Sequence, residues 1–163
     1  MNALPDNARQ IAPQAQLAFA HHATVRLPRA IPPLEAWNRI MARPLPFMAL
    51  AFRLRDALSA PFGVARIGGF SGARRSQVRA GDKLDFFEVE EIAADALVLT
   101  ARDTHLEVMT SLTTKGAELT LASSVVTRNR FGRVYMLPVG PAHKLIVAAM
   151  LARLKREMEA EGG

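Results

Sequence analysis

The chain has 163 residues, half of them hydrophobic, and 21 Lys or Arg outweigh 15 Asp or Glu to give a net charge of +6. This length and apolar content suffice for one domain with a single core and are too small for two. The chain contains no cysteine, which excludes disulfide bonds and thiolate chemistry.

No segment predicts export or membrane insertion. The N-terminus lacks the basic start and continuous apolar core of a signal peptide. The longest apolar runs end at Arg53 and Arg153, well short of the roughly 18 uninterrupted apolar residues that cross a bilayer. We therefore expect a soluble, cytoplasmic protein without a membrane span.

The first half of the chain predicts an arm, a strand and a helix. Residues 1–18 show no clear period and are expected to form a loose N-terminal arm before a single domain over residues 19–160. Residues 21–27 predict a short strand, which three prolines between residues 28 and 33 separate from the next element. Residues 34–42 predict a short helix that ends before Pro44 and Pro46.

A second helix is expected after Pro44 and Pro46. Its apolar side chains recur at helical spacing over residues 47–60, and the stripe comprises Phe47, Leu50, Ala51, Leu54 and Leu58. Residues 66–81 are rich in Gly, Ser and Arg and predict a flexible connection.

Four β-rich runs follow, over residues 83–92, 96–103, 105–114 and 117–129. The separators between them have the length of hairpin turns, so the pattern predicts an antiparallel sheet. Alternation in the third and fourth runs gives inward faces that consist of Leu106, Val108, Thr110, Leu112, Leu119, Leu121, Ser123, Val125 and Thr127. Hydroxyl groups among these aliphatic side chains favour the wall of a cavity over a closed core.

The last element is expected to be a helix over residues 141–159. One stripe at helical spacing comprises His143, Ile146, Val147, Met150 and Leu154. Three glutamates follow at its C-terminal end, where negative charge opposes the helix dipole, so we expect that end to fray.

Several short motifs resemble a bacterial family described as domain of unknown function 2867. They are Leu-Asp-Phe at 84–86, Asn-Arg-Phe-Gly-Arg-Val-Tyr at 129–135, Pro-Ala-His at 141–143, Leu-Arg-Asp-Ala-Leu at 54–58 and Phe-Gly-Val at 62–64. The resemblance covers roughly residues 20 to 155, and the chain departs from the family pattern at Phe87 and Ala142. It implies an α+β helix-grip fold of the START-like, or SRPBCC, superfamily, in which an antiparallel sheet wraps a long C-terminal helix and leaves an apolar cavity.

The polar junction over residues 129–135 has two interpretations. Turn chemistry alone accounts for Asn129 and Gly132, with the asparagine capping the next helix. Alternatively, Arg133 and Tyr135 contact the polar end of a ligand. His143 is interpreted either as a hydrogen-bonded rim residue or as a group that orients a ligand or transfers a proton.

Asp85 is predicted to lie in a strand, facing away from Leu84 and Phe86, and to pair with Arg55 or Arg133. A structural ion pair is favoured there over a catalytic acid. The four histidines show no metal-ligand spacing, so no metal and no cofactor are expected.

The function expected from these features is binding of an apolar small molecule or lipid. The cavity-lining residues are expected to be Leu106, Val108, Thr110, Leu119, Leu121, Ser123, Val125, Arg133, Tyr135, His143, Ile146, Val147 and Met150. One alternative is an enzyme of the cyclase or dehydratase type that uses His143, Asp85 or Tyr135 for acid–base chemistry. A second alternative is an interaction module that uses its basic surface.

The charge distribution bears on that last alternative. Residues 128–156 contain seven Arg or Lys and no acid, whereas residues 82–118 contain nine acids and three bases. A basic patch attracts phosphate, nucleic acid or anionic lipid. Sparse aromatic residues and the absence of a recognition motif argue against nucleic acid.

Overall fold

The protein is built on one antiparallel sheet of six strands, in the order β1-β6-β5-β4-β3-β2. The computed structural model describes residues 4–46, 48–63, 66 and 68–163. The strands are β1 Phe19–Arg26, β2 Lys83–Leu84, β3 Phe87–Ile92, β4 Ala96–Arg102, β5 Leu106–Lys115 and β6 Glu118–Thr127. Every neighbouring pair is antiparallel, which confirms the sheet predicted from the hairpin-length turns.

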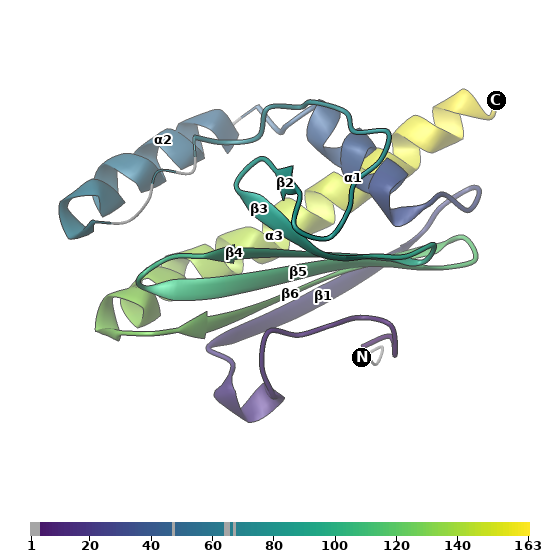
Figure 1. The fold of residues 1–163 in the computed structure, drawn as a ribbon. Coiled ribbons are helices and arrows are strands. Elements are labelled where there is room, and N and C mark those ends of the chain that lie inside the picture. Colours follow the sequence, from purple (N-terminus) through teal and green to yellow (C-terminus); the bar gives the residue numbers. More distant parts are fainter. Residues whose placement is uncertain (1–3, 47, 64–65, 67) are drawn as a thin grey trace.

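The helices lie on one face of this sheet, here called the inner face (Figure 1). They are α1 Pro33–Ala42, α2 Met48–Ser59 and α3 Arg130–Glu161, and the short 3-10 turn η2 Ala60–Phe62 follows α2. A second 3-10 turn, η1 Gln14–Gln16, belongs to the N-terminal arm. The long helix α3 runs over β1 and β6, while α1 packs beside it over β4 and β5. The architecture is therefore α+β, as expected.

Strand register confirms which side chains share the inner face. Thr110 lies opposite Ser123, and Ser123 lies opposite His21 on the next strand. The remaining pairs of β5 and β6 on this face are Leu106 with Thr127, Val108 with Val125, and Leu112 with Leu121. The alternation found in the sequence therefore assigned these side chains to one face correctly.

The core lies between the inner face, α1 and the second half of α3. Residues Leu97, Leu99, Leu112 and Leu119 are fully inaccessible to solvent. The helices contribute Ala36, Trp37, Ile40 and Met41 from α1, and Val147, Met150, Leu151, Leu154 and Met158 from α3. These positions recur every three or four residues, so each helix buries one apolar stripe.

The run over residues 83–92 is a hairpin rather than one strand. It turns at Asp85 and Phe86, because Asp85 adopts a left-handed backbone conformation with φ of 55°. Aspartate tolerates this region better than most residues. The expected pairing of Asp85 with Arg133 is absent among the described residues, and Asp85 Oδ1 instead accepts a hydrogen bond from the backbone N–H of Ser71 at 3.0 Å.

Some expectations for the second helix lie outside the described residues. The structure places a helix over Met48–Ser59. Phe47, Val64 and the side chains of Leu50, Ala51, Leu54, Arg55 and Leu58 are not among the described parts of the chain. In Figure 1, α2 extends from α1 toward the end of the molecule where α3 begins.

The final helix begins eleven residues earlier than expected, at Arg130. Asn129 is its N-cap, since Asn129 Oδ1 accepts a hydrogen bond from the N–H of Gly132 at 3.0 Å, as its capping interpretation predicted. Pro138 and Pro141 lie inside the helix. Both prolines are exposed, so water can hydrate the carbonyl groups left without donors.

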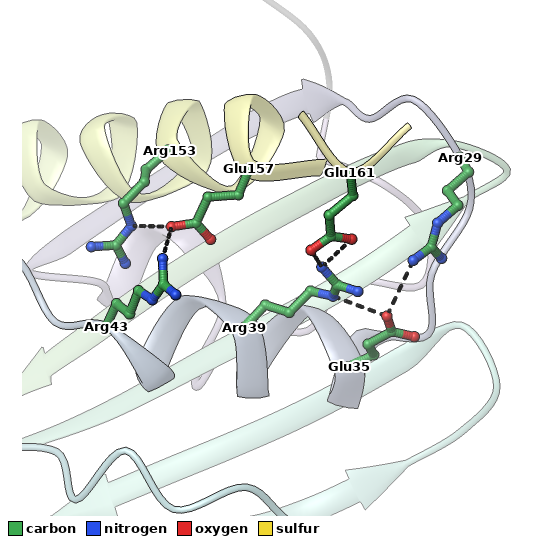
Figure 2. A network of polar contacts seen from close by, with 7 residues as sticks. All are labelled: Arg29, Glu35, Arg39, Arg43, Arg153, Glu157 and Glu161. Carbon is green, nitrogen blue, oxygen red and sulfur yellow. Dashed lines mark hydrogen bonds and ion pairs between the residues drawn. The ribbon is translucent and has the colours of Figure 1, made fainter. Parts of the chain in front are cut away.

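The other end of α3 is joined to α1 by the ion pairs shown in Figure 2. Arg39 Nη1 lies 2.7 Å from Glu161 Oε1, and Arg39 Nε lies 2.9 Å from Glu35. Glu157 is paired with Arg153 at 3.7 Å. The helix extends to Glu161 rather than fraying earlier, because α1 supplies cations to the glutamates at its end.

The N-terminal residues 4–18 lie on the face of the sheet away from the helices (Figure 1). The backbone N–H of Ile11 donates a hydrogen bond to Ser124 Oγ at 2.9 Å, and Arg9 pairs with Glu91 at 2.7 Å. These contacts place the arm across the outer face of the sheet.

The first turn of α3 depends on a glycine. A Cβ atom on Gly132 would lie 2.5 Å from the carbonyl oxygen of His105. Because that oxygen belongs to the backbone, Gly132→Ala is expected to lower the free energy of unfolding by about 1–3 kcal/mol. Urea denaturation measures this change.

Gly140→Ala is the matched control in the same helix. Its Cβ would meet only ring atoms of Phe19, at 3.1 Å, and a side chain can rotate away. The gain in helix propensity of up to about 1 kcal/mol offsets the contact, so little change is expected. Equal stability of the Gly132 variant and the wild-type protein would contradict the close approach described here.

Candidate functional site

Two histidines and a phenylalanine meet on the inner face, and we call them the histidine cluster. Phe19 and His21 come from β1, and His143 comes from α3. The ring centroids of His21 and His143 are 6.0 Å apart, and those of Phe19 and His143 are 5.6 Å apart, both nearly perpendicular. The cluster joins the edge strand of the sheet to the middle of the long helix.

Strand pairing and a close helix contact position the cluster. Register places His21 opposite Ser123 and Phe19 opposite Val125. Gly140 lets α3 approach the Phe19 ring. Ser123 Oγ lies 3.1 Å from Thr110 Oγ1, so the two buried hydroxyls satisfy each other beside the histidines.

Two ring nitrogens of the cluster are buried without a hydrogen-bond partner among the described residues: His21 Nδ1 and His143 Nε2. His21 as a whole is partly exposed, but its Nδ1 atom is inaccessible to solvent. Leaving a buried donor or acceptor unsatisfied costs about 1–3 kcal/mol. A water molecule, an ion or a polar group of a ligand can satisfy such an atom when the protein chain does not.

Both histidines are held in the neutral form. Burial lowers the pKa of His143 from 6.5 to about 4, with a smaller contribution from His21. Burial also lowers the pKa of His21, together with the nearby Lys144. A neutral imidazole offers one N–H donor and one acceptor nitrogen, so the cluster suits a neutral polar group better than an anion.

The inner face is covered unevenly on the two sides of this cluster. Toward α1, Leu112 and Leu119 are fully inaccessible. Toward the start of α3, Leu106 and Val108 on the same face of β5 are only partly buried. The second half of α3 therefore closes a packed core, while the first half leaves apolar sheet surface less completely covered.

The thirteen residues expected to line a cavity divide into two groups. Eleven lie on the inner face of the sheet or on the inward side of α3, in line with the predicted stripes. Arg133 is exposed, and Tyr135 is half-buried. At 1.5 Å per residue, Tyr135 lies about 12 Å along the helix axis from His143, so the two are separate features.

Asp85 is also distant from His143. It follows β2, which forms one edge of the sheet, whereas the histidine cluster lies at β1, the opposite edge. Five strand spacings of about 4.8 Å separate these edges along the sheet. The two groups therefore cannot act on one small substrate as an acid–base pair.

Asp85 instead borders an open hollow of about 340 Å³ at the hairpin turn. The hollow is lined by Gly68, Gly69, Phe70, Ser71, Asp85 and Phe86. Of these, Asp85 alone was considered from the sequence as a functional group, and none was predicted to line the cavity. Among the described residues, no group of three or more His, Asp or Glu is placed to hold a metal ion.

His105 has a structural role at the start of α3. Asn129 Nδ2 lies 2.7 Å from His105 Nδ1, and His105 Nε2 lies 2.9 Å from the carbonyl oxygen of Phe62. The amide donates to Nδ1 and Nε2–H donates to the carbonyl, so both ring nitrogens are satisfied by a neutral imidazole. This histidine is not available to a ligand in the way that His21 and His143 are.

Sequence reasoning missed Phe19 and His21 as site residues. The strand was expected to begin at residue 21, and its histidines were considered only as metal ligands. Their role arises from the pairing of β1 with β6, which lies about a hundred residues further along the chain. The only local signal was alternation, which points His21 and His22 to opposite faces.

A family model described as a protein of unknown function, DUF2867, matches residues 13–150. Neither the curated proteins nor the solved structures gave a match.

The depressed pKa of His143 predicts a specific pH dependence of stability. Between the unfolded-state pKa of 6.5 and the folded-state value of about 4, the unfolded chain binds more protons, so stability falls as the pH falls. From about pH 7.5 to pH 5 this group should remove about 2 kcal/mol, and His143→Gln should lose that component. Urea unfolding at both pH values measures the difference.

The matched control is His22→Gln, which changes the neighbouring histidine on the outer face. This variant should keep the pH dependence of the wild-type protein. An identical loss of stability in the wild-type and His143→Gln proteins would show that His143 titrates normally.

Proposed function

The chain belongs to the DUF2867 family, and we propose that it binds a small apolar molecule whose single neutral polar group reaches the histidine cluster. The observation that carries this proposal is the pair of buried nitrogens, His21 Nδ1 and His143 Nε2, that have no hydrogen-bond partner among the described residues. One hydroxyl group on a ligand could donate to one nitrogen and accept from the other.

The location of the ligand follows from the uneven covering of the inner face. The less covered half lies between β5, β6 and the first half of α3, where Leu106 and Val108 are only partly buried. An aromatic or lipid-like body would cover these side chains, while its polar end would lie at His21 and His143. Ligand sites of this type are mostly apolar with a few convergent polar groups.

This arrangement supports a helix-grip fold of the START-like, or SRPBCC, superfamily. The features in its favour are the antiparallel sheet, in which β2 to β6 form a meander and β1 pairs with β6, and the long final helix lying across its inner face. In such a fold the space between sheet and helix is where a ligand would bind. The proposed site and the proposed superfamily are therefore consistent with each other.

A matched pair of probes tests the proposal. The protein is titrated with 2-naphthol and with naphthalene, which differ by one hydroxyl group. Binding is measured from the NMR signals of the histidine Cε1–H groups. A net hydrogen bond is worth about 0.5–1.5 kcal/mol, so 2-naphthol should bind roughly two- to tenfold more tightly. His143→Phe should abolish this preference while retaining affinity for naphthalene.

His22→Phe serves as the control, because it makes the same kind of change on the opposite face of β1. It should leave the preference for 2-naphthol intact. Extraction of the purified protein with organic solvent, followed by mass spectrometry, provides an independent search for the natural ligand. Failure of both probes to shift the His21 and His143 resonances would contradict the proposal.

A further inference from the structure

The large exposed apolar side chains gather at one place on the molecule. Among the described residues they are Phe62, Val134, Leu137 and Leu145, exposed by 56%, 64%, 72% and 74%. Three lie on α3, and Phe62 stacks on Phe131 of the same helix with ring centroids 4.5 Å apart. We call this surface the α3 patch.

The α3 patch continues as an apolar stripe along the helix. The exposed residues of α3 between positions 134 and 152 are Val134, Leu137, Pro138, Pro141, Ala142, Lys144, Leu145, Ala148, Ala149 and Ala152. Only Lys144 among them is charged. By length and composition alone α3 could cross a membrane, although no membrane span was expected from the apolar runs in the sequence.

Basic side chains border the patch. Arg130, Arg133 and Lys144 are exposed and lie within the same stretch of helix. Residues 128–156 contain no acid, and the nearby Glu107 is already paired with Arg128. An apolar stripe bordered by cations is the pattern of a helix that lies in the headgroup region of an anionic membrane.

We propose that the α3 patch binds the surface of a membrane containing anionic lipids. The apolar side chains would enter the boundary between headgroups and acyl chains, and Arg130, Arg133 and Lys144 would contact lipid phosphates. The exposed apolar side chains lie on the side of α3 that the sheet does not cover. Lys144 lies at the border between this surface and the histidine cluster, because its Nζ atom is 6.0 Å from the centre of the Phe19 ring.

The charges favour a lipid surface over a second copy of the chain. A symmetric pair of α3 helices would place their arginines and lysines against each other with no acid in this stretch to compensate. Like charges brought together in this way oppose association. Anionic headgroups supply the missing counter-charge.

The structure also favours the membrane surface over the membrane interior. One side of α3 is buried against β1, β6 and α1. Pro138 and Pro141 lack the N–H groups that would bond the carbonyl oxygens of Val134 and Leu137. Water at the interface can hydrate those oxygens, whereas the hydrocarbon core cannot.

Sedimentation with vesicles tests the proposal on the full chain. Vesicles of phosphatidylcholine alone are compared with vesicles that also contain phosphatidylglycerol. The protein should bind the mixed vesicles and bind the neutral vesicles at least tenfold more weakly. Arg130→Gln with Arg133→Gln should weaken binding by roughly fivefold for each arginine.

Two further variants separate the apolar and charge contributions. Leu137→Gln with Leu145→Gln should reduce binding at least tenfold without unfolding the protein, because both side chains are exposed. Arg74→Gln with Arg79→Gln removes the same charge from the loop before β2 and should leave binding unchanged. Urea unfolding of each variant confirms that the fold is retained.

Three results would overturn the proposal. The first is absence of binding to both kinds of vesicle. The second is binding that responds equally to both arginine pairs, which would indicate net charge rather than this surface. The third is a stable dimer that Leu137→Gln dissociates, without vesicle binding, which would assign the patch to a second copy.

Discussion

The contact between the first turn of α3 and the turn that precedes β5 determines how the long helix crosses the sheet. Asn129 caps the helix and is hydrogen-bonded to His105, which in turn reaches the backbone of Phe62. Gly132 rests directly against the His105 carbonyl group. Because a helix is stiff, the position of its first turn determines the direction of the rest of α3. At 1.5 Å per residue, Glu161 lies more than 40 Å along the helix from this turn, where it pairs with Arg39.

The helix that is fixed in this way has different roles along its length. Its second half buries Val147, Met150 and Leu154 in the core. Near its middle it brings His143 to β1, where two buried ring nitrogens have no partner in the part of the chain that the structure describes, at a cost to stability. Functional sites often contain hydrogen-bonding groups that lower stability in this way, because a group that hydrogen-bonds a ligand cannot be satisfied by another group of the protein at the same time.

Much of the fold was predictable because its signals are local. Hairpin-length turns indicated antiparallel pairing, and alternation in β5 and β6 identified the inner face. The β2–β3 hairpin was missed because its turn consists of Asp85 and Phe86 within an otherwise β-like run, and one left-handed aspartate leaves no local pattern. The start of α3 was missed because two prolines normally indicate a helix end, whereas here both lie on the exposed side.

The site was less predictable than the fold because it depends on contacts distant in sequence. His143 was identified from its helical stripe, and its position beside the sheet agrees with that. His21 could not be identified as a site residue from the sequence. Its neighbours Ser123 and His143 are about 100 and 120 residues away, and no rule based on spacing connects them. The exposed α3 patch was hidden for the same reason: the sequence shows that a helix is apolar, but not which side the sheet covers.

The pairing of β1 with β6 also has a consequence for biosynthesis. Phe19 pairs with Val125 and Arg26 with Glu118, so β1 leaves the ribosome 92 to 106 residues before the residues of β6 with which it pairs. The apolar side of the nascent sheet then stays uncovered until α3, which follows all six strands in the chain, has emerged. A chain whose synthesis stops before residue 130 would therefore expose a wide apolar surface and an unpaired strand, the features that recruit chaperones and lead to aggregation.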